Sequence, residues 1–323
     1  MPLVSVVIPC YNAGEYIEKC LLALEAQSFS DFEVIAVNDC STDDTAAVVR
    51  RFAETHGLKI TCIDNEVNSG PAHSRNRGVE RSDAEYVAFC DSDDWYEPDY
   101  LQLMVEAARQ NDADMVFCNS QKILPDGRVA KIELISESCR VETAGDALRL
   151  GVDSLCSILV KRSIVERTPQ PNLRNGEDMA VIPLMILKSE RFGVVTKPIY
   201  NYLCRPGSLS LSANERVVAS MEASFDHIVK NQVAGYEKEI EFIGVKNVVY
   251  GVLLNHFKYS KDRKKARELL ARFESRFPRW WKNPYIGSLP SYKRLFVCFA
   301  RLGMLRTVCM MARVHKFLTE KDC

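Results

Sequence analysis

Apolar residues follow two alternating patterns over the first 120 residues. Short continuous runs, rich in β-branched side chains, are each followed by a stretch with apolar residues at helical spacing. The runs predict strands at residues 3–9, 32–39, 58–64, 84–91 and 113–119. Strands that are apolar throughout and separated by helices indicate a parallel sheet covered by helices on both faces, so the predicted fold class is α/β.

The ends of the predicted helices carry further signals. Ser41, with Asp44 three residues later, has the spacing of a capping box and predicts that a helix begins there and is closed by Gly57. A hairpin is expected over residues 121–134, turned at 125–127, and a further strand near 156–161. From about residue 213 only helical patterns remain. We therefore expect a catalytic domain at 1–210 and a helical C-terminal region at 211–323.

Polar side chains gather where the predicted strands end. Those after the first strand are Tyr11 and Asn12, the one after the second is Asp39, and those after the fourth are Asp91, Ser92, Asp93 and Asp94. Ligands of open α/β sheets bind beyond the carboxyl ends of the strands. A base stacked on Tyr11, an imide N–H donated to Asp39 and ribose hydroxyls bound by Asp91 would seat a nucleotide, and Asp93 would bind a divalent cation.

Two common nucleotide sites do not fit. The first strand lacks G-x-G-x-x-G, which disfavours a nicotinamide or flavin dinucleotide, and no P-loop motif occurs anywhere in the sequence.

Five stretches, in this order, resemble the signature of the inverting family 2 glycosyltransferases, which have the GT-A fold, a Rossmann-like nucleotide-diphospho-sugar transferase fold. They are "VSVVIPCYNAGEYIEKCL", "VIAVNDCSTDDT", "NSGPAHSRNRGV", "VAFCDSDDWYEPDYL" and "NGEDM". The resemblance covers about residues 3–210. Cys40 stands where many members have glycine. The implied fold is a mostly parallel sheet with a C-terminal helical extension.

The resemblance implies roles for individual residues. It assigns the donor nucleotide, most commonly uracil-containing, to Pro9, Tyr11, Asn12, Asp39, Arg75, Asp91 and Ser92. It makes Asp93, with Asp91, the site of Mn²⁺ or Mg²⁺, and Asp178 the base that takes the proton of the acceptor hydroxyl. Contacts with the diphosphate or the acceptor are assigned to Arg205, Asp94, Trp95 and Glu177, and Trp95 and Tyr96 are expected to stack on an acceptor sugar.

Structural explanations compete with some of these roles. Taken alone, Asp39 is typical of a turn residue at the start of a helix, and Asp94 is typical of a helix-start residue before Pro98. Glu177 is typical of a cap of the helix that presents Asp178. Because all the motifs occur together, the nucleotide interpretation is favoured for Asp39.

Charge is distributed unevenly. The net charge is −1, yet residues 256–323 hold 17 Lys or Arg against 5 Asp or Glu, which leaves 25 against 38 in residues 1–255. A helix from Tyr292 onward would gather Arg294, Arg301, Arg306, Arg313 and Lys316 on one face and apolar residues on the other, as in a helix lying on anionic lipid. The competing interpretation packs this helix on the catalytic domain. Nucleic acid is not expected as a partner, because no known binding motif accompanies the charge.

These patterns lead to one functional prediction and two alternatives. The prediction is an inverting hexosyl- or N-acetylhexosaminyltransferase. It moves a sugar from a UDP-sugar to a glycan on a lipid carrier, in surface polysaccharide synthesis at the cytoplasmic face of the membrane. The alternatives are a sugar-phosphate nucleotidyltransferase and a non-catalytic glycan-binding protein of the same fold. The C-terminal helices would also suit a homodimer, and scattered cysteines without a secretion signal favour the cytoplasm.

Overall fold

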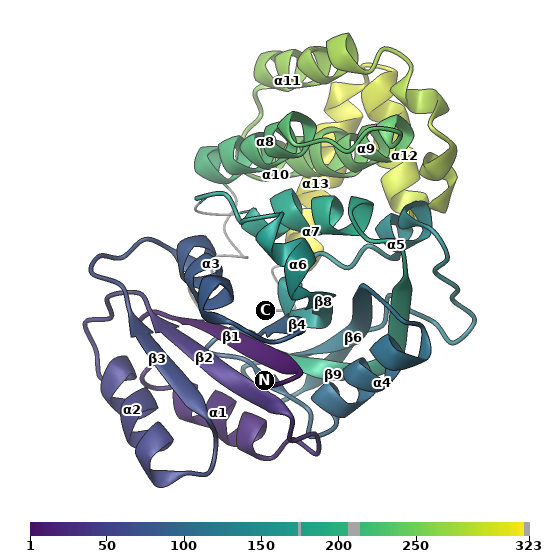
Figure 1. Ribbon diagram of the computed structural model, residues 1–323. Coiled ribbons are helices and arrows are strands. Elements are labelled where there is room, and N and C mark those ends of the chain that lie inside the picture. Colours follow the sequence, from purple (N-terminus) through teal and green to yellow (C-terminus); the bar gives the residue numbers. More distant parts are fainter. Residues whose placement is uncertain (174–175, 206–213, 320–323) are drawn as a thin grey trace. The chain divides into compact units, whose positions relative to one another are not determined.

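The computed structural model describes residues 1–173, 176–205 and 214–319 (Figure 1). The chain divides into two compact units. The first comprises Met1–Asn172 and Lys188–Cys204, and the second comprises Leu173–Leu187 and Arg205–Cys323.

Within the described residues, the first unit is built on one nine-stranded sheet with the order β3-β2-β1-β4-β8-β6-β9-β5, and β7 pairs with β6. Neighbours among β1 to β4 pair in parallel, as do β6 and β9, while β8 lies antiparallel between β4 and β6. The strands are β1 (Val4–Cys10), β2 (Phe32–Asn38), β3 (Ile60–Asp64), β4 (Tyr86–Phe89), β5 (Trp95–Tyr96), β6 (Met115–Ile123), β7 (Val129–Ile132), β8 (Ile158–Lys161) and β9 (Phe192–Leu203). The five strands predicted at residues 3–119 and the α/β class are confirmed.

Burial explains the apolar runs. All seven residues of β1 and the five inner residues of β2 are buried. Helices α1 (Ile17–Glu25) and α2 (Thr45–Thr55) lie on one side of β1 to β3, and α3 (Pro71–Arg81) lies on the other (Figure 1). Gly78 allows α3 to approach β1 closely, since a Cβ at this position would lie 2.3 Å from Cγ1 of Val7. The sheet therefore needs apolar side chains on both faces.

The predicted start of α2 is wrong. The helix begins at Thr45, with Asp44 as its N-cap residue and no side-chain cap. Ser41 instead accepts a hydrogen bond from the backbone N–H of Asn12, 3.1 Å away, and Asp43 accepts one from the N–H of Gly14 at 3.0 Å. These side chains connect the loop after β1 to the loop after β2. A capping rule considers only residues close in the chain and cannot predict such contacts.

The rest of the first unit completes the sheet. The predicted hairpin is confirmed as β6 and β7, with Gly127 at a φ of 82° in its turn, and the strand near 156–161 is β8. The remaining helices are α4 (Tyr100–Gln110), α5 (Ala144–Leu150), the 3₁₀ turn η1 (Leu155–Ser157) and α6 (Arg162–Glu166).

The second unit contains helices around an aromatic core. Its fully buried large side chains are Phe242, Phe257, Trp280 and Phe296. The elements are α7 (Glu177–Leu187), α8 (Glu215–Lys230), α9 (Glu237–Gly244), the π-helical segment η3 (Val245–Val252), α10 (Leu253–Tyr259), α11 (Arg263–Arg276), the 3₁₀ turns η4 (Trp280–Lys282) and η5 (Pro284–Ser288), α12 (Ser291–Arg301) and α13 (Leu305–Thr319). The predicted change to helices after residue 213 is confirmed.

The single helix predicted from Tyr292 onward is wrong, because the chain breaks it between α12 and α13. Gly303 adopts a φ of 68°, its N–H donates to the carbonyl of Ala300, and the N–H of Met304 donates to that of Phe299. This is a Schellman motif, which glycine favours because the left-handed conformation costs it little. Within the described residues, no helix is long and apolar enough to cross a membrane.

Candidate active site

Three loops of the first unit leave the same edge of the sheet. β1, β2 and β4 are neighbouring parallel strands, and Tyr11, Asp39 and Asp91 follow them. The Tyr11 side chain is 49% exposed, so its ring is open to a stacking partner. The polar side chains predicted to follow the strand ends therefore lie along one edge of the sheet.

Asn12 fastens the first loop to the second. Its side-chain oxygen accepts a hydrogen bond from the backbone N–H of Thr42 at 2.9 Å. Asn12 and Cys40 both have positive φ values, 48° and 58°, next to Tyr11 and Asp39 respectively. Glycine adopts this conformation without strain, which explains why a glycine would suit position 40.

Asp39 holds the loop that starts α3. Its carboxylate is buried and accepts hydrogen bonds from the side chain of Asn65 at 2.6 Å and from the backbone N–H groups of Ser69 at 3.0 Å and Gly70 at 2.7 Å. Each carboxylate oxygen has about two acceptor positions, so one of the two oxygens retains capacity for a further donor. The expected contact with a base remains a prediction.

Arg75 points at Asp91. One terminal nitrogen of its guanidinium lies 2.7 Å from a carboxylate oxygen of Asp91, and the side chains are 5% and 36% exposed. The second terminal nitrogen lies 3.5 Å from the side-chain oxygen of Gln170. Asn76 on the same helix holds Gln170 through two backbone contacts, each of 2.9 Å. Arg75 therefore orients the predicted ribose ligand Asp91 from within the unit.

Asp91, Ser92, Asp93 and Asp94 form a turn closed by a 3.0 Å hydrogen bond from the N–H of Asp94 to the carbonyl of Asp91. Asp94 is 1% exposed; the hydroxyl of Tyr200 donates to one carboxylate oxygen and the N–H of Leu203 to the other, at 2.8 Å. Burial, and then the neighbouring carboxylates of Asp91 and Asp93, raise the pKa of Asp94. Both Asp94 oxygens thus serve β9, and the expected helix-start role is wrong, since α4 begins at Tyr100 after Asp99.

Trp95 and Tyr96 differ in exposure. Tyr96 is buried, stacks on Tyr100 with 3.7 Å between ring centroids, and donates its hydroxyl to the carbonyl of Phe89. The expectation that Tyr96 stacks on an acceptor sugar is therefore wrong. Trp95 is partly exposed, and the ammonium of Lys19 lies 3.1 Å from its ring centroid. Burial lowers the pKa of Lys19.

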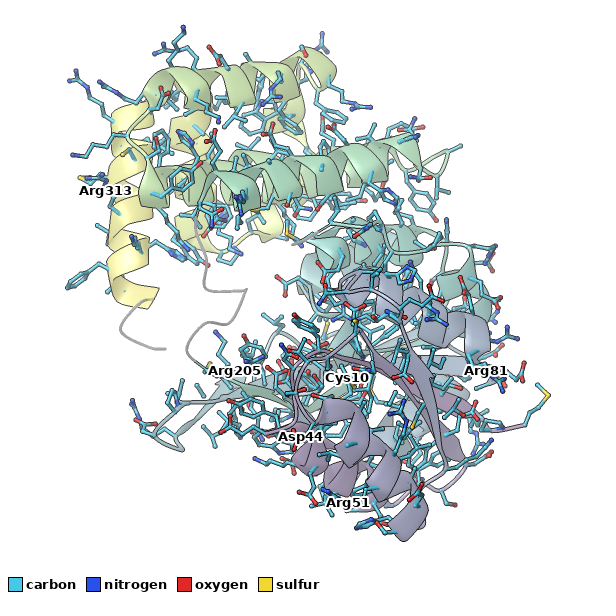
Figure 2. The ribbon with its side chains drawn as sticks, turned by 90° about the vertical axis from the view of Figure 1, so that its left-hand side faces the viewer. Cys10, Asp44, Arg51, Arg81, Arg205 and Arg313 are labelled. Carbon is cyan, nitrogen blue, oxygen red and sulfur yellow. The ribbon has the colours of Figure 1, made fainter. Side chains whose placement is uncertain are left out.

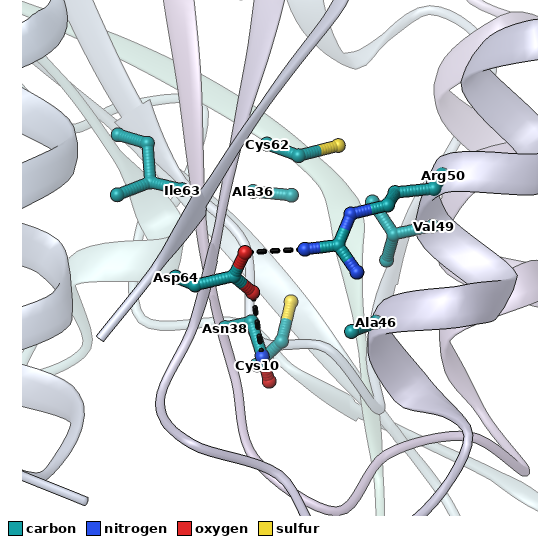
Figure 3. Close-up of a pocket in the computed structure, with 9 residues that line it drawn as sticks. All are labelled: Cys10, Ala36, Asn38, Ala46, Val49, Arg50, Cys62, Ile63 and Asp64. Carbon is teal, nitrogen blue, oxygen red and sulfur yellow. Dashed lines mark hydrogen bonds and ion pairs between the residues drawn. The ribbon is translucent and has the colours of Figure 1, made fainter. Parts of the chain in front are cut away.

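A small hollow lies between α2 and strands β1 to β3 (Figure 3). Arg50 pairs with Asp64, which accepts a second hydrogen bond from Asn38 at 2.8 Å. Burial raises the pKa of the Cys10 and Cys62 thiols that line it, so both are weak nucleophiles. The acidic group of the hollow, Asp64, is already paired with Arg50. None of the residues predicted to bind the nucleotide-sugar lines the hollow.

Glu177, Asp178 and Arg205 belong to the second unit. Glu177 and Asp178 occupy the first turn of α7, and both side chains are partly exposed. The hydroxyl of Ser224 on α8 donates to the carbonyl of Gly176 at 2.8 Å and fixes the start of this helix. Residues 206–213, which follow Arg205, lie outside the described residues.

Several contributors to the site were not anticipated from the sequence. They are Asn65, Gln170, Lys19, Tyr200 and Ser224. Each acts on a residue far away in the chain. Lys19 stands within the first stretch that carries the resemblance, and the other four lie outside all five stretches.

Comparisons with known proteins show which family this chain resembles. Residues 5–166 match the family "Glycosyl transferase family 2". The putative teichuronic acid biosynthesis glycosyltransferase TuaG of Bacillus subtilis (strain 168) is 32% identical over 179 residues, which cover 55% of this chain and 70% of TuaG. The chain spans about a third of the length of two other relatives.

Solved structures share the fold. That of Staphylococcus aureus TarS 1–349 in complex with UDP-GlcNAc has a TM-score of 0.72 and 22% identity, covering 98% of this chain and 92% of that one. That of the mannosyltransferase PcManGT from Pyrobaculum calidifontis, in complex with GDP-Man and Mn²⁺, has a TM-score of 0.54 and 18% identity, covering 98% and 87%. The fold is GT-A, and the chain belongs to glycosyl transferase family 2. The protein is thus a glycosyltransferase, and the nucleotidyltransferase alternative is set aside.

Proposed function

We propose that this glycosyltransferase moves a hexose or N-acetylhexosamine from a UDP-sugar to a glycan acceptor with inversion at the anomeric carbon. The observation that carries the proposal is the edge of the sheet where Tyr11, Asp39 and Asp91 follow three neighbouring parallel strands. An open tyrosine ring, a carboxylate with remaining acceptor capacity and a carboxylate oriented by Arg75 suit a base and a ribose. The TarS structure with UDP-GlcNAc supports a uridine donor.

We assign a divalent cation, Mn²⁺ or Mg²⁺, to Asp93 with Asp91. Such cations usually take only one or two protein carboxylates when substrate phosphates complete the coordination. This fits the described residues, in which no three His, Cys, Asp or Glu side chains form a ready-made metal cluster. When bound, the cation neutralises charge on the departing diphosphate. The Mn²⁺ in the PcManGT complex supports this assignment.

Asp178 is proposed as the catalytic base. A sugar hydroxyl is a poor nucleophile, so a carboxylate within about 3 Å must accept its proton as it attacks the anomeric carbon. A single in-line displacement then expels the nucleoside diphosphate from the opposite face and inverts the centre. Arg205 and Glu177 are assigned to the diphosphate or the acceptor, and Trp95 to the acceptor.

Two variants separate these roles. Asp178→Asn should retain UDP binding in the presence of Mn²⁺ and lose transfer, because only the proton acceptor is removed. Asp93→Ala should weaken UDP binding with Mn²⁺ and leave metal-free UDP binding unchanged. Binding is measured by calorimetry and transfer by product formation. Wild-type turnover in Asp178→Asn would refute the base, and unchanged Mn²⁺-supported affinity in Asp93→Ala would refute the metal ligand.

We further propose that residues 1–210 form the catalytic domain and that 211–323 carry it to an anionic membrane, where the acceptor glycan is lipid-linked. Residues 275–319 contain nine Lys or Arg and no Asp or Glu. Eight large hydrophobic side chains are exposed between Tyr292 and Leu318: Tyr292, Leu295, Leu302, Met304, Met310, Val314, Phe317 and Leu318. Arg313 extends outward from α13 (Figure 2).

This combination suits the interface of an anionic bilayer, where apolar side chains enter the acyl region and basic groups remain with the head groups. The name of TuaG, a putative teichuronic acid biosynthesis glycosyltransferase, supports a role in bacterial surface polysaccharide synthesis. We place this role at the cytoplasmic face of the membrane. A homodimer through the same surface is the competing arrangement.

A further inference from the structure

The turn formed by Asp91, Ser92, Asp93 and Asp94 is anchored at both ends by buried groups of the first unit. At its start, Asp91 is held by Arg75 from α3, whose side chain is 5% exposed. At its end, Asp94 is held by β9, through the hydroxyl of Tyr200 and the backbone N–H of Leu203. Only Ser92 and Asp93 lie between the two anchors.

Burying the Asp94 carboxyl group costs more free energy than a purely structural contact would require. Taking a carboxyl group out of water carries a large cost that hydrogen bonds must offset. Two further carboxylates, of Asp91 and Asp93, lie within three residues and add repulsion, so an apolar residue would fill this position at lower cost. Asp94 is nevertheless 1% exposed, and each of its oxygens accepts a hydrogen bond from β9.

The surroundings of Asp94 are rigid. Tyr96 packs edge-on against Tyr200, with 6.0 Å between ring centroids, and face-on against Tyr100. The hydroxyl of Tyr96 binds the carbonyl of Phe89 at 2.7 Å, where β4 ends. Residues 95–96 pair with Tyr200 and Asn201 in the sheet. The Tyr200 hydroxyl is therefore presented to Asp94 from a fixed position.

We propose that Asp94 is a positioning residue, which acts through Tyr200 and Leu203 to keep Asp93 and Asp91 in the geometry that a divalent cation requires. This inference rests on the metal site of the proposed function. Because the Asp94 side chain is buried, we assign it no direct contact with the cation or the donor, in place of the diphosphate or acceptor contact that the resemblance implies. Its two hydrogen bonds hold the acidic turn in a compact form against the repulsion between its carboxylates. The cation therefore meets ligands that are already positioned.

Tyr200→Phe tests this role, because it removes one hydroxyl and keeps the ring. The matched control is Tyr86→Phe, which removes another buried hydroxyl of the sheet, one that donates to the carbonyl of Ala113 at 3.0 Å. UDP binding by the full chain is measured by calorimetry with and without Mn²⁺. We expect Tyr200→Phe to lower the Mn²⁺-supported UDP affinity roughly tenfold, as for one lost hydrogen bond to a charged group. Metal-free UDP affinity should be unchanged, and Tyr86→Phe should bind as wild type does in both conditions.

Asp94→Asn provides the second variant, since an amide keeps the size of the side chain and an acceptor for Leu203. It should show the same selective loss. If both variants fold and keep the wild-type gain in affinity from Mn²⁺, or lose affinity equally without metal, the positioning role is refuted while the metal site stands. If wild-type protein itself gains no UDP affinity from Mn²⁺, the proposed metal site fails and this inference falls with it.

Discussion

The guanidinium of Arg75 on α3 donates a hydrogen bond to the carboxylate of Asp91 at the end of β4, with 2.7 Å between nitrogen and oxygen. Arg75 is almost fully buried, whereas Asp91 is 36% exposed. Arg75 therefore orients the Asp91 carboxylate, and the stretch "NSGPAHSRNRGV" contains this arginine. In the proposed function, Arg75 would act on the nucleotide through Asp91.

Removing the contact between Arg75 and Asp91 should impair binding of the nucleotide more than it impairs folding. Arg75→Met should lower UDP affinity about tenfold, since Asp91 loses a charged hydrogen-bond donor worth roughly 1.5–3 kcal/mol. Arg81→Met, at the exposed end of the same helix (Figure 2), is the control and should bind UDP normally. Equal affinities of the two variants in calorimetry would show that the pair does not orient a nucleotide ligand.

Cys40→Gly should stabilise the protein. Cys40 has a φ of 58°, a conformation that costs a non-glycine residue roughly 1–2 kcal/mol. Relief of this cost should exceed the entropic penalty of glycine and raise the free energy of unfolding by up to about 1 kcal/mol. Cys62→Gly, in the middle of β3, should instead lower it. Urea denaturation distinguishes the two, and a destabilised Cys40→Gly protein would contradict the backbone account.

The ion pair of Asp114 and Lys161 should make stability depend on pH. Burial raises the pKa of Asp114, but hydrogen bonds from Lys161 at 2.9 Å and from the N–H groups of Glu190 and Arg191 outweigh it, and the net pKa is lowered. Because the folded-state pKa lies below the unfolded value of about 3.9, the stabilisation is present above that value and disappears as pH falls through the folded-state pKa.

Asp114→Asn should therefore lower the free energy of unfolding by about 1–3 kcal/mol at pH 7. The difference from wild type should shrink below about pH 4. Asp83→Asn, at an exposed position, is the control and should change stability little. A pH-independent difference for Asp114→Asn in denaturation curves would show that the carboxylate charge is not the source.

The C-terminal surface should bind anionic vesicles. Leu302→Glu combined with Phe317→Glu should abolish co-sedimentation with phosphatidylglycerol vesicles, because both side chains are 61% exposed and would enter the acyl region. Leu22→Glu changes a leucine on α1 that is 47% exposed, and this control should leave binding intact. Unchanged vesicle binding by the double variant would refute this surface. A shift from dimer to monomer in light scattering would assign the surface to self-association.

The sequence predicted those features that depend on neighbours close in the chain. Apolar runs predicted the first strands, and Pro-Asp-Gly predicted the hairpin turn. The capping box at Ser41 was wrong because the hydroxyl serves Asn12, 29 residues away. Continuous helical spacing after Tyr292 concealed the break at Gly303, since periodicity does not register a single left-handed residue.

The candidate site shows the same limit. Ordered motifs placed Tyr11, Asp39 and Asp91 at one edge of the sheet, and the strand pairing agrees. Asp94 and Tyr200 lie 106 residues apart in the chain. Their contact joins the turn after β4 to β9, and β8 and β6 lie between these two strands in the sheet. No local pattern signals such a contact. Burial of Asp94 and Tyr96 likewise depends on the closure of β5 onto β9.

In the proposed function, this chain transfers a sugar from a nucleotide donor with the help of a divalent cation. The most direct test is nucleotide release by the purified protein from a panel of UDP-, GDP- and dTDP-sugars, with Mn²⁺ and again with EDTA. We expect turnover of a UDP-sugar with Mn²⁺ that EDTA abolishes. Absence of binding to every nucleotide of the panel in the presence of Mn²⁺ would contradict it.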